Sequence, residues 1–214
     1  IKVGAKIVVT DPTPEIKDLC RELVVRNPDY DKAMVHGKTR FTRIPEYIWL
    51  YEVVGNEIHL PFGVLSKVWE IHPYKDDWEL LFAPNRRFKY KSDISLYAYQ
   101  DRAVNEAIRA KNGILVMPCG TGKTQCGLEI ISRVGGRALW LTHTGELLNQ
   151  SKARAEDNFE DAGSGTITAG KVNIGQGITF ATVQTLCKID LEAHKNDWDI
   201  IIVDECHHCC GSHS

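Results

Sequence analysis

Residues 117–124 limit the fold of this chain more than any other stretch. They read Met-Pro-Cys-Gly-Thr-Gly-Lys-Thr and follow an apolar run at 113–117, so we expect a strand, a glycine-containing loop and then a helix. Small residues let a loop backbone curve around phosphate groups, and the N-terminus of a helix adds positive potential there. In such a loop Lys123 would reach the β- and γ-phosphates of a nucleotide, and the Thr124 hydroxyl would hold Mg²⁺.

The remaining loop positions are expected to surround the same phosphates: Cys119, Gly120, Thr121 and Gly122. The strict form of this pattern has a glycine where the chain has Met117, seven residues before Thr124. The order of strand, loop and helix favours a phosphate loop in spite of that difference. The alternative is an ordinary glycine turn that leaves a lysine exposed.

The composition, 43% apolar and 25% charged residues in a chain of 214, is typical of a soluble protein with one large or two small domains. The sequence has no run of about 18 apolar residues, so we expect no membrane span. Seven cysteines, an odd number, favour reduced thiols and a cytoplasmic location. The chain starts at Ile1 without signal-peptide character, which we interpret as a trimmed start. A net charge of −2 gives no overall basic field, so a surface for nucleic acid would have to be a local patch.

Residues 1–95 are expected to form a small α+β domain with its own core. Aromatic and β-branched residues on both sides of Gly55-Asn56 predict a β-hairpin, and Thr13-Pro14 predicts the start of a helix. The expected elements are a strand at 6–9, a helix from 14 to 25 or 26, a polar loop at 29–43, a hairpin at 47–60, a short helix at 64–71 and a strand at 78–82.

Residues 96–214 instead alternate between helical and strand-like patterns. This alternation predicts an α/β fold, in which a parallel sheet is covered by helices on both faces. Helices are expected at 98–111 and 146–158, and a third helix is expected after the phosphate loop, including residues 128–131 and stopping at Gly135-Gly136. The expected strands lie at 113–117, 137–142, 166–168, 178–181 and 199–203.

The one dense basic run of the sequence is Arg86-Arg87-Phe88-Lys89-Tyr90-Lys91. Interleaved cations and aromatic rings can follow a phosphate backbone and stack on bases, which makes Arg86 and Arg87 candidate nucleic-acid contacts. The alternative is an edge strand whose charges prevent pairing with another sheet. Because only one such run occurs, the sequence favours this alternative.

Asp204 and Glu205 directly follow the most hydrophobic strand candidate, which we expect to be buried. In open α/β sheets, ligands bind at the carboxyl ends of the strands. Asp204 would help to hold Mg²⁺, and Glu205 would orient and deprotonate the water that attacks the γ-phosphate. The alternative is an acidic N-cap of a following helix. We expect Lys123, Thr124, Asp204 and Glu205 to meet around one ATP and its Mg²⁺.

With Gly-Thr-Gly-Lys-Thr at 120–124 and Asp-Glu-Cys-His at 204–207, the chain resembles superfamily 2 helicases and translocases of the Asp-Glu-x-His type. Tyr99-Gln100 is similar to the glutamine motif of that superfamily, which implies that Gln100 reads the adenine edge. Residues 141–148 are similar to its motif Ia, and residues 182–186 are similar to its motif Ib.

Over about residues 96–210 the resemblance is closest to excision-repair helicases, phage recombination helicases and restriction-enzyme motor subunits. It implies a RecA-like P-loop lobe at 96–214 that acts as a monomer on nucleic acid, on DNA rather than RNA. It also implies a second lobe in cis, beyond Ser214, which supplies an arginine for phosphoryl transfer. We therefore expect the chain alone to bind ATP–Mg²⁺ weakly, to hydrolyse it very slowly and not to unwind a duplex.

The resemblance further implies roles for single residues outside the phosphate loop. Motifs Ia and Ib would lie along a nucleic-acid strand and contact its phosphates through backbone amides and hydroxyl groups. His207 would couple the nucleotide to the rest of the motor, whereas Gly145 stands where the family usually has an arginine. The implied strand contacts are Thr142, His143, Thr182 and Gln184.

Three other interpretations stay open. The tail holds six potential zinc ligands, but structural zinc usually takes two ligand pairs separated by a dozen or more residues, so we expect no zinc site. The chain could also be an ATPase switch without a nucleic-acid role, or a binding module at 1–95 with a passive nucleotide site. The six potential ligands are Cys206, His207, His208, Cys209, Cys210 and His213.

Overall fold

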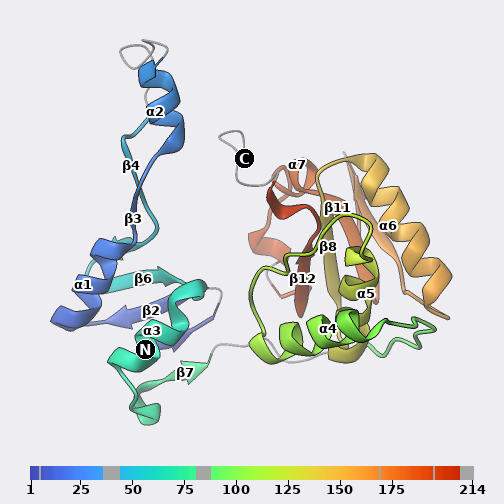
Figure 1. The fold of residues 1–214 in the computed structure, drawn as a ribbon, viewed down its shortest axis with the longest axis horizontal. Coiled ribbons are helices and arrows are strands. Elements are labelled where there is room, and N and C mark those ends of the chain that lie inside the picture. The colour runs from blue at the N-terminus through green and yellow to red at the C-terminus, as the bar shows by residue number, and fades with distance from the viewer. Residues whose placement is uncertain (5, 36–43, 81–87, 169, 195, 208–214) are drawn as a thin grey trace. The chain divides into compact units, whose positions relative to one another are not determined.

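The computed structural model describes residues 1–4, 6–35, 44–80, 88–168, 170–194 and 196–207. The chain divides into two compact units, Ile1–Phe82 (unit 1) and Ala83–Ser214 (unit 2), whose elements are labelled in Figure 1. The division falls before the boundary at residue 95 expected from the sequence, because Phe88 and Tyr90 pack into the core of unit 2. Among the residues described, no helix is long and apolar enough to cross a membrane.

Unit 1 contains a five-stranded sheet in the order β5–β6–β2–β1–β7, and a separate two-stranded ribbon of β3 and β4. Helices α1 and α3 contribute Ile16 and Val68 to its core, where they meet Ile7 and Leu60 of the sheet. The bounds are β1 Lys2–Val3, β2 Lys6–Thr10, α1 Pro14–Glu22, β3 Val24–Arg26, α2 Pro28–Val35, β4 Tyr47–Trp49, β5 Glu52–Val54, β6 Glu57–Pro61, η1 Phe62–Val64, α3 Leu65–Ile71, η2 Lys75–Asp77 and β7 Glu79–Leu80.

Two predictions for unit 1 are wrong. Helix α1 ends at Glu22, because the β-branched Val24 and Val25 form β3 and pair with β4. The polar stretch predicted as a loop contains α2, where Pro28 is the first helical residue and the Asn27 side chain accepts a hydrogen bond from the Asp29 amide at 3.0 Å. Asn followed by Pro is a common helix start, because the Asn side chain caps the first turn and Pro fits the first helical position.

The hairpin around Gly55-Asn56 is confirmed, with Val54 opposite Glu57 in the antiparallel β5–β6 pair. Its first strand begins only at Glu52, since the preceding residues of β4 pair with β3 instead. The structure also confirms the strand at β2 and the short helix α3. Of the predicted strand at 78–82, the structure describes the two residues of β7.

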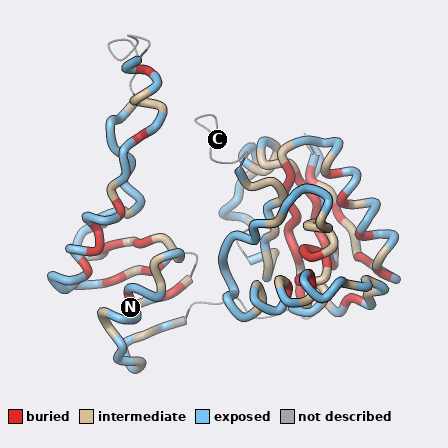
Figure 2. Tube along the Cα trace, viewed as in Figure 1, coloured by how far each residue is buried: buried red, intermediate tan, exposed pale blue. Residues whose placement is uncertain are grey.

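Unit 2 is built on a five-stranded sheet in the order β10–β9–β11–β8–β12, in which all pairs except β9–β10 are parallel. All five residues of β8, which lies between β11 and β12, are buried, as expected of a parallel strand covered on both faces (Figure 2). The bounds are α4 Ala98–Ala110, α5 Lys123–Val134, β8 Ala138–Thr142, α6 Gly145–Asn158, β9 Gly165–Thr168, β10 Lys171–Asn173, β11 Ile178–Thr182, α7 Val183–Leu186, η3 Glu192–His194 and β12 Ile200–Val203.

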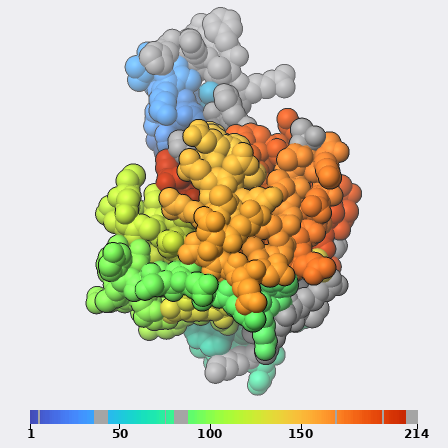
Figure 3. Space-filling view, turned by 90° about the vertical axis from the view of Figure 1, so that its right-hand side faces the viewer, coloured from blue at the N-terminus to red at the C-terminus, as the bar shows by residue number. Residues whose placement is uncertain are grey.

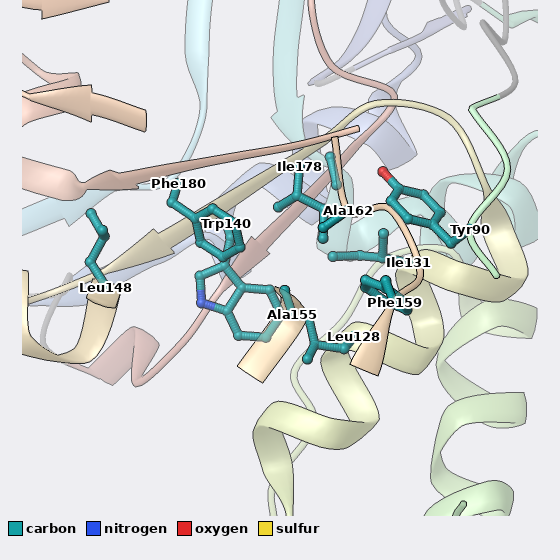
Figure 4. Packing of buried hydrophobic residues seen from close by; sticks show 11 residues of the cluster. Tyr90, Leu128, Ile131, Trp140, Leu148, Ala155, Phe159, Ala162, Ile178 and Phe180 are labelled. Carbon is teal, nitrogen blue, oxygen red and sulfur yellow. The ribbon is translucent and has the colours of Figure 1, made fainter. Parts of the chain in front are cut away.

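The two faces of this sheet have separate cores. On one face Trp140 and Phe180 pack against Leu128 of α5 and Ala155 of α6 (Figure 4). On the other face Leu139, Leu141 and Ala181 pack against α7 and the segment that follows it. Helix α4 packs against α5 through Val104, and the space-filling view shows α4 in green and α6 in gold at the surface (Figure 3). This is the α/β architecture that the alternating pattern predicts.

Two strand predictions for unit 2 need correction. Residues 113–117 form no strand, and Ile114 and Val116 are 78% and 87% exposed, because none of the described strands pairs with them. Strand β12 forms, but it is an edge strand and not a buried one, since β8 is its only neighbour among the described strands. On one face of β12, Ile201 and Val203 are also 58% and 37% exposed.

Replacing Gly127 with valine is expected to lower the free energy of unfolding by about 2 kcal/mol, because the site between α5 and β8 has no room. A Cβ atom at Gly127 would lie 2.7 Å from Cη2 and 2.9 Å from Cζ3 of Trp140. Urea denaturation measures the change. Gly145→Val is the matched control, since no heavy atom lies within 4 Å of a Cβ atom there. Equal stabilities of the two variants would contradict this packing.

Candidate functional site

The loop before α5 has the backbone that a phosphate loop requires. Gly120 and Gly122 have φ angles of +77° and +84°, a left-handed conformation that glycine adopts without strain. Gly122 caps the N-terminus of α5, and the Thr121 hydroxyl donates to the carbonyl of Pro118 at 2.7 Å. Lys123 and Thr124 are consequently the first two residues of the helix, as the sequence predicts.

The loop meets the end of β12. The Lys123 ammonium donates to Oε1 of Glu205 at 2.7 Å, although the two residues are 82 positions apart in the chain. Both side chains are a little under a third exposed, at 28% and 29%. Glu205 has a φ angle of +52°, which is uncommon for a residue with a side chain and is characteristic of functional sites. The structure thus brings together two of the four predicted central residues by direct contact.

Electrostatics link the same groups to Asp204. Burial raises the pKa of Asp204 above its usual value, and the Glu205 charge adds to this effect, while Lys123 and Arg154 act in the opposite direction. The hydrogen bond to Glu205 raises the pKa of Lys123. Asp204 directly follows β12, at the carboxyl end of that strand.

Glu205 also contacts His207, since its Oε2 atom lies 3.4 Å from His207 Nδ1. The carboxylate thus bridges Lys123 and the residue predicted to couple the nucleotide to the motor. In the described part of the chain, no three histidine, cysteine or acidic side chains form a metal-binding group. Four of the six potential zinc ligands lie outside the described residues: His208, Cys209, Cys210 and His213.

Gln100 is buried, with 5% exposure, and both ends of its amide contact the protein. Its Nε2 donates to the carbonyl of Thr121 at 2.9 Å, and its Oε1 accepts from the Tyr97 amide at 2.8 Å. The Tyr99 hydroxyl donates to the same Thr121 carbonyl at 3.1 Å. In this arrangement Gln100 and Tyr99 brace the phosphate loop, a role that the sequence did not indicate; adenine reading by Gln100 stays a prediction.

Tyr97 and Tyr99 form a parallel pair beside the loop, with ring centroids 5.9 Å apart and an interplanar angle of 5°. Both rings are exposed, at 71% and 49%. The sequence analysis did not single out Tyr97 as a neighbour of the phosphate loop. Two aromatic residues so close to the glutamine of a phosphate-loop protein are a signal that could have indicated this position.

The structure brings the four predicted strand contacts to one edge of the sheet. Thr142 and Thr182 are register partners at the ends of β8 and β11, and Gln184 Nε2 lies 3.5 Å from His143 Nδ1. The Thr142 side chain, however, is fully buried and its hydroxyl donates to the carbonyl of Thr144 at 3.0 Å. This hydroxyl does not face outward, whereas Gln184 is exposed.

The described part of the basic run has a structural role. Phe88 and Tyr90 pack inward, and the Tyr90 hydroxyl donates to the carbonyl of Gly136 at 2.8 Å. Lys91 pairs with Glu160 at 2.7 Å. The described part of the run, residues 88–91, belongs to no strand. Arg86 and Arg87 lie outside the described residues, so their contact with nucleic acid stays a prediction.

Replacing Tyr90 with phenylalanine is expected to cost about 1 kcal/mol of unfolding free energy at neutral pH, because the Gly136 carbonyl loses its donor. Burial raises the pKa of Tyr90, and Asp199 adds to the effect. The contribution of Tyr90 is thus complete below the usual tyrosine pKa of about 10 and is lost as pH rises toward the folded value. Denaturation at neutral and at alkaline pH should show that Tyr90→Phe loses less unfolding free energy between the two pH values than the unchanged chain does. Tyr74→Phe, at an exposed position, is the control; equal alkaline losses in the two variants would contradict the expectation.

Residues 93–214, more than half of the chain, match the family model described as type III restriction enzyme, res subunit. The chain is 35% identical over 118 residues to the DNA 3'-5' translocase XPB2 of Sulfurisphaera tokodaii, which covers 55% of the chain and 26% of that protein. It is 25% identical over 174 residues to the general transcription and DNA repair factor IIH helicase/translocase subunit XPB of Dictyostelium discoideum. This match covers 73% of the chain and 21% of that protein.

The chain therefore spans about a quarter of the length of the curated relatives it matches. Among solved structures, the UvsW helicase from bacteriophage T4 is similar with a TM-score of 0.60 at 19% identity, covering 89% of this chain and 76% of that chain. At this identity the likeness shows a shared fold, and it confirms the fold class expected from the sequence.

Proposed function

The chain belongs to the family of the type III restriction enzyme res subunit, and on that premise we propose that the protein is an ATP-dependent motor that moves along or remodels DNA. Membership confirms the resemblance to superfamily 2 motors. The observation that supports the proposal most is the contact between Lys123 and Glu205, because it joins the phosphate loop to the acidic strand end.

The residues present fit ATP with Mg²⁺. Lys123, the glycine-rich loop and the N-terminus of α5 offer positive potential to phosphates, while Thr124 and Asp204 offer the oxygen ligands that Mg²⁺ prefers. When bound, Mg²⁺ supplies positive charge that offsets the charge developing on the phosphates. Thr124 and Asp204 would hold the ion, and Lys123 would hold the β- and γ-phosphates.

Hydrolysis requires Glu205 to be released from Lys123. In the ligand-free chain the carboxylate that would deprotonate water is paired with the lysine that would bind phosphate. Phosphates compete for the lysine, so nucleotide binding would leave Glu205 available as a general base that orients the attacking water. His207, on the other oxygen of Glu205, would transmit this change to the rest of the motor.

DNA is the nucleic acid that we propose, since the two curated relatives are named as a DNA translocase and as a subunit of a DNA repair factor. His143, Gln184 and the backbone at the ends of β8 and β11 would contact strand phosphates without reading sequence. The relatives are much longer than this chain, so full activity is proposed for the whole protein. We expect the 214 residues alone to turn ATP over slowly, because they span about a quarter of the length of the relatives and we propose that an arginine for phosphoryl transfer comes from elsewhere in the whole protein.

Measurements of ATP binding and of ATP hydrolysis with and without DNA test the proposal. We expect Mg²⁺-dependent ATP binding, slow hydrolysis, and DNA binding that weakens as salt increases. ATP binding without any DNA affinity would instead favour an ATPase switch. DNA binding by residues 1–214 without ATP binding would favour a passive nucleotide site, and either outcome would contradict the motor.

A further inference from the structure

We propose that Arg133 is a positioning residue for the nucleotide site, an inference that rests on the function proposed above. Arg133 lies in the last turn of α5, about 15 Å along the helix axis from Lys123. At this distance it cannot belong to the phosphate loop. Its side chain is 32% exposed, and all three nitrogen atoms of its guanidinium donate hydrogen bonds.

The guanidinium joins α5 to the start of α4. Nε donates to Oε1 of Glu129 on the same helix at 2.7 Å. Nη1 donates to Oδ1 of Asn105 at 2.8 Å, and Nη2 donates to Oδ1 of Asp101 at 2.7 Å. A planar guanidinium presents these donors in a fixed geometry, so the contacts define one orientation of α4 relative to α5.

The acceptors are themselves held in place. Oδ2 of Asp101 accepts from Asn105 at 3.1 Å, and Oε2 of Glu129 accepts from the Ser92 hydroxyl at 3.1 Å. Glu129 is only 12% exposed, which makes its pair with Arg133 less screened than a surface pair. A network in which each member is satisfied favours a single arrangement.

Asp101 connects this network to the nucleotide site because it directly follows Gln100. Arg133 donates to Asp101, and the preceding residue, Gln100, donates to the Thr121 carbonyl of the phosphate loop. Gln100 also lies so close to the loop that a Cβ atom at Gly122 would be 2.3 Å from its Nε2. A rotation of the first turn of α4 would therefore remove the support of the loop.

Apolar contacts alone do not determine that rotation. Val104 packs against Cys126 and Ile130 between the two helices, but hydrophobic attraction has no preferred direction. Between α4 and α5 themselves, the hydrogen bonds of Arg133 to Asn105 and Asp101 supply the directional contacts. It follows that Arg133 affects ATP affinity through Gln100 without touching the nucleotide.

The test measures the dissociation constant of a fluorescent ATP analogue for the 214-residue chain and its variants. Arg133→Met is expected to weaken binding by about tenfold, and Arg133→Lys, which keeps the charge but lacks the planar fork, by less. Arg109→Met is the matched control and should bind as the unchanged chain does. Arg109 pairs with Glu106 within α4, and its side chain is 78% exposed.

The decisive measurement repeats Arg133→Met in a Gln100→Ala background. If Arg133 acts through Gln100, the second substitution adds less than about twofold to the loss caused by Gln100→Ala. A full tenfold loss in that background would overturn the proposal, because it would show a general structural effect. Equal ATP binding by Arg133→Met and the unchanged chain would overturn it as well.

Two further measurements keep the result interpretable. If the unchanged chain does not bind ATP, the proposed function fails, which differs from the failure of this inference. If Arg133→Met does not fold by circular dichroism, Asp101→Asn replaces it, since this variant keeps the Arg133–Glu129 pair. In the chain that retains Gln100, Asp101→Asn should weaken ATP binding by about threefold, and an unchanged affinity would again overturn the proposal.

Discussion

Lys123→Ala is expected to weaken ATP binding by about a hundredfold and to remove measurable hydrolysis. The ammonium is the cation at the start of α5, and in the ligand-free chain it contacts Glu205 at 2.7 Å. Without it, the phosphates would meet the Glu205 carboxylate without the lysine charge that attracts them. Isothermal titration with ATP–Mg²⁺ measures the affinity, and phosphate release measures turnover.

Stability should change little in this variant. A partly exposed ion pair contributes roughly 0–1 kcal/mol, so thermal unfolding should remain close to that of the unchanged chain. Lys152→Ala is the matched control, because Lys152 is also partly exposed and faces a glutamate, Glu156, but lies on α6. Unchanged ATP affinity in Lys123→Ala, or an equal loss in Lys152→Ala, would rule out the role proposed for the loop.

Glu205→Gln is expected to separate binding from hydrolysis. Glutamine has the shape of glutamate but cannot take a proton from water, so the rate should fall by about 10²–10⁴. ATP affinity should be retained or increased, since Lys123 would no longer be tied to a carboxylate that competes with phosphate. Rapid-quench hydrolysis and equilibrium binding of ATP measure the two quantities on the same protein.

Because the unchanged 214-residue chain should be slow already, the hydrolysis comparison for Glu205→Gln needs single-turnover conditions with DNA present. Glu160→Gln is the control, at an exposed glutamate that pairs with Lys91 away from the phosphate loop. Hydrolysis at the unchanged rate in Glu205→Gln would exclude this residue as the general base. A combined loss of binding and hydrolysis would instead indicate that Glu205 shapes the loop.

Local sequence patterns predicted much of unit 2. Gly122 and Lys123 marked the start of α5, Gly135 marked its end, and the apolar run of β8 marked a buried strand. These features depend on glycine conformation, helix ends and side-chain periodicity, which act over a few residues. The same local signals failed at 113–117, because an apolar run becomes a strand only where another strand pairs with it.

The candidate site was likewise predicted only in part from the sequence. The residue types at Lys123, Thr124, Asp204 and Glu205 indicate phosphate and Mg²⁺ chemistry from the sequence alone. The bracing of the loop by Gln100 could not be predicted, since a glutamine amide can bond a ligand or the backbone, and only its surroundings decide between them.

The amino-acid sequence by itself predicted the chemistry proposed for this protein, since a glycine-rich loop before a lysine and an acidic strand end are residue patterns typical of phosphate and Mg²⁺ binding. Tertiary structure alone decided which of these groups touch. Lys123 reaches Glu205 across 82 positions, and Arg133 reaches Asp101 across 32, through the packing of helices on a sheet. Such contacts depend on the mutual orientation of whole elements, which no short stretch of sequence encodes.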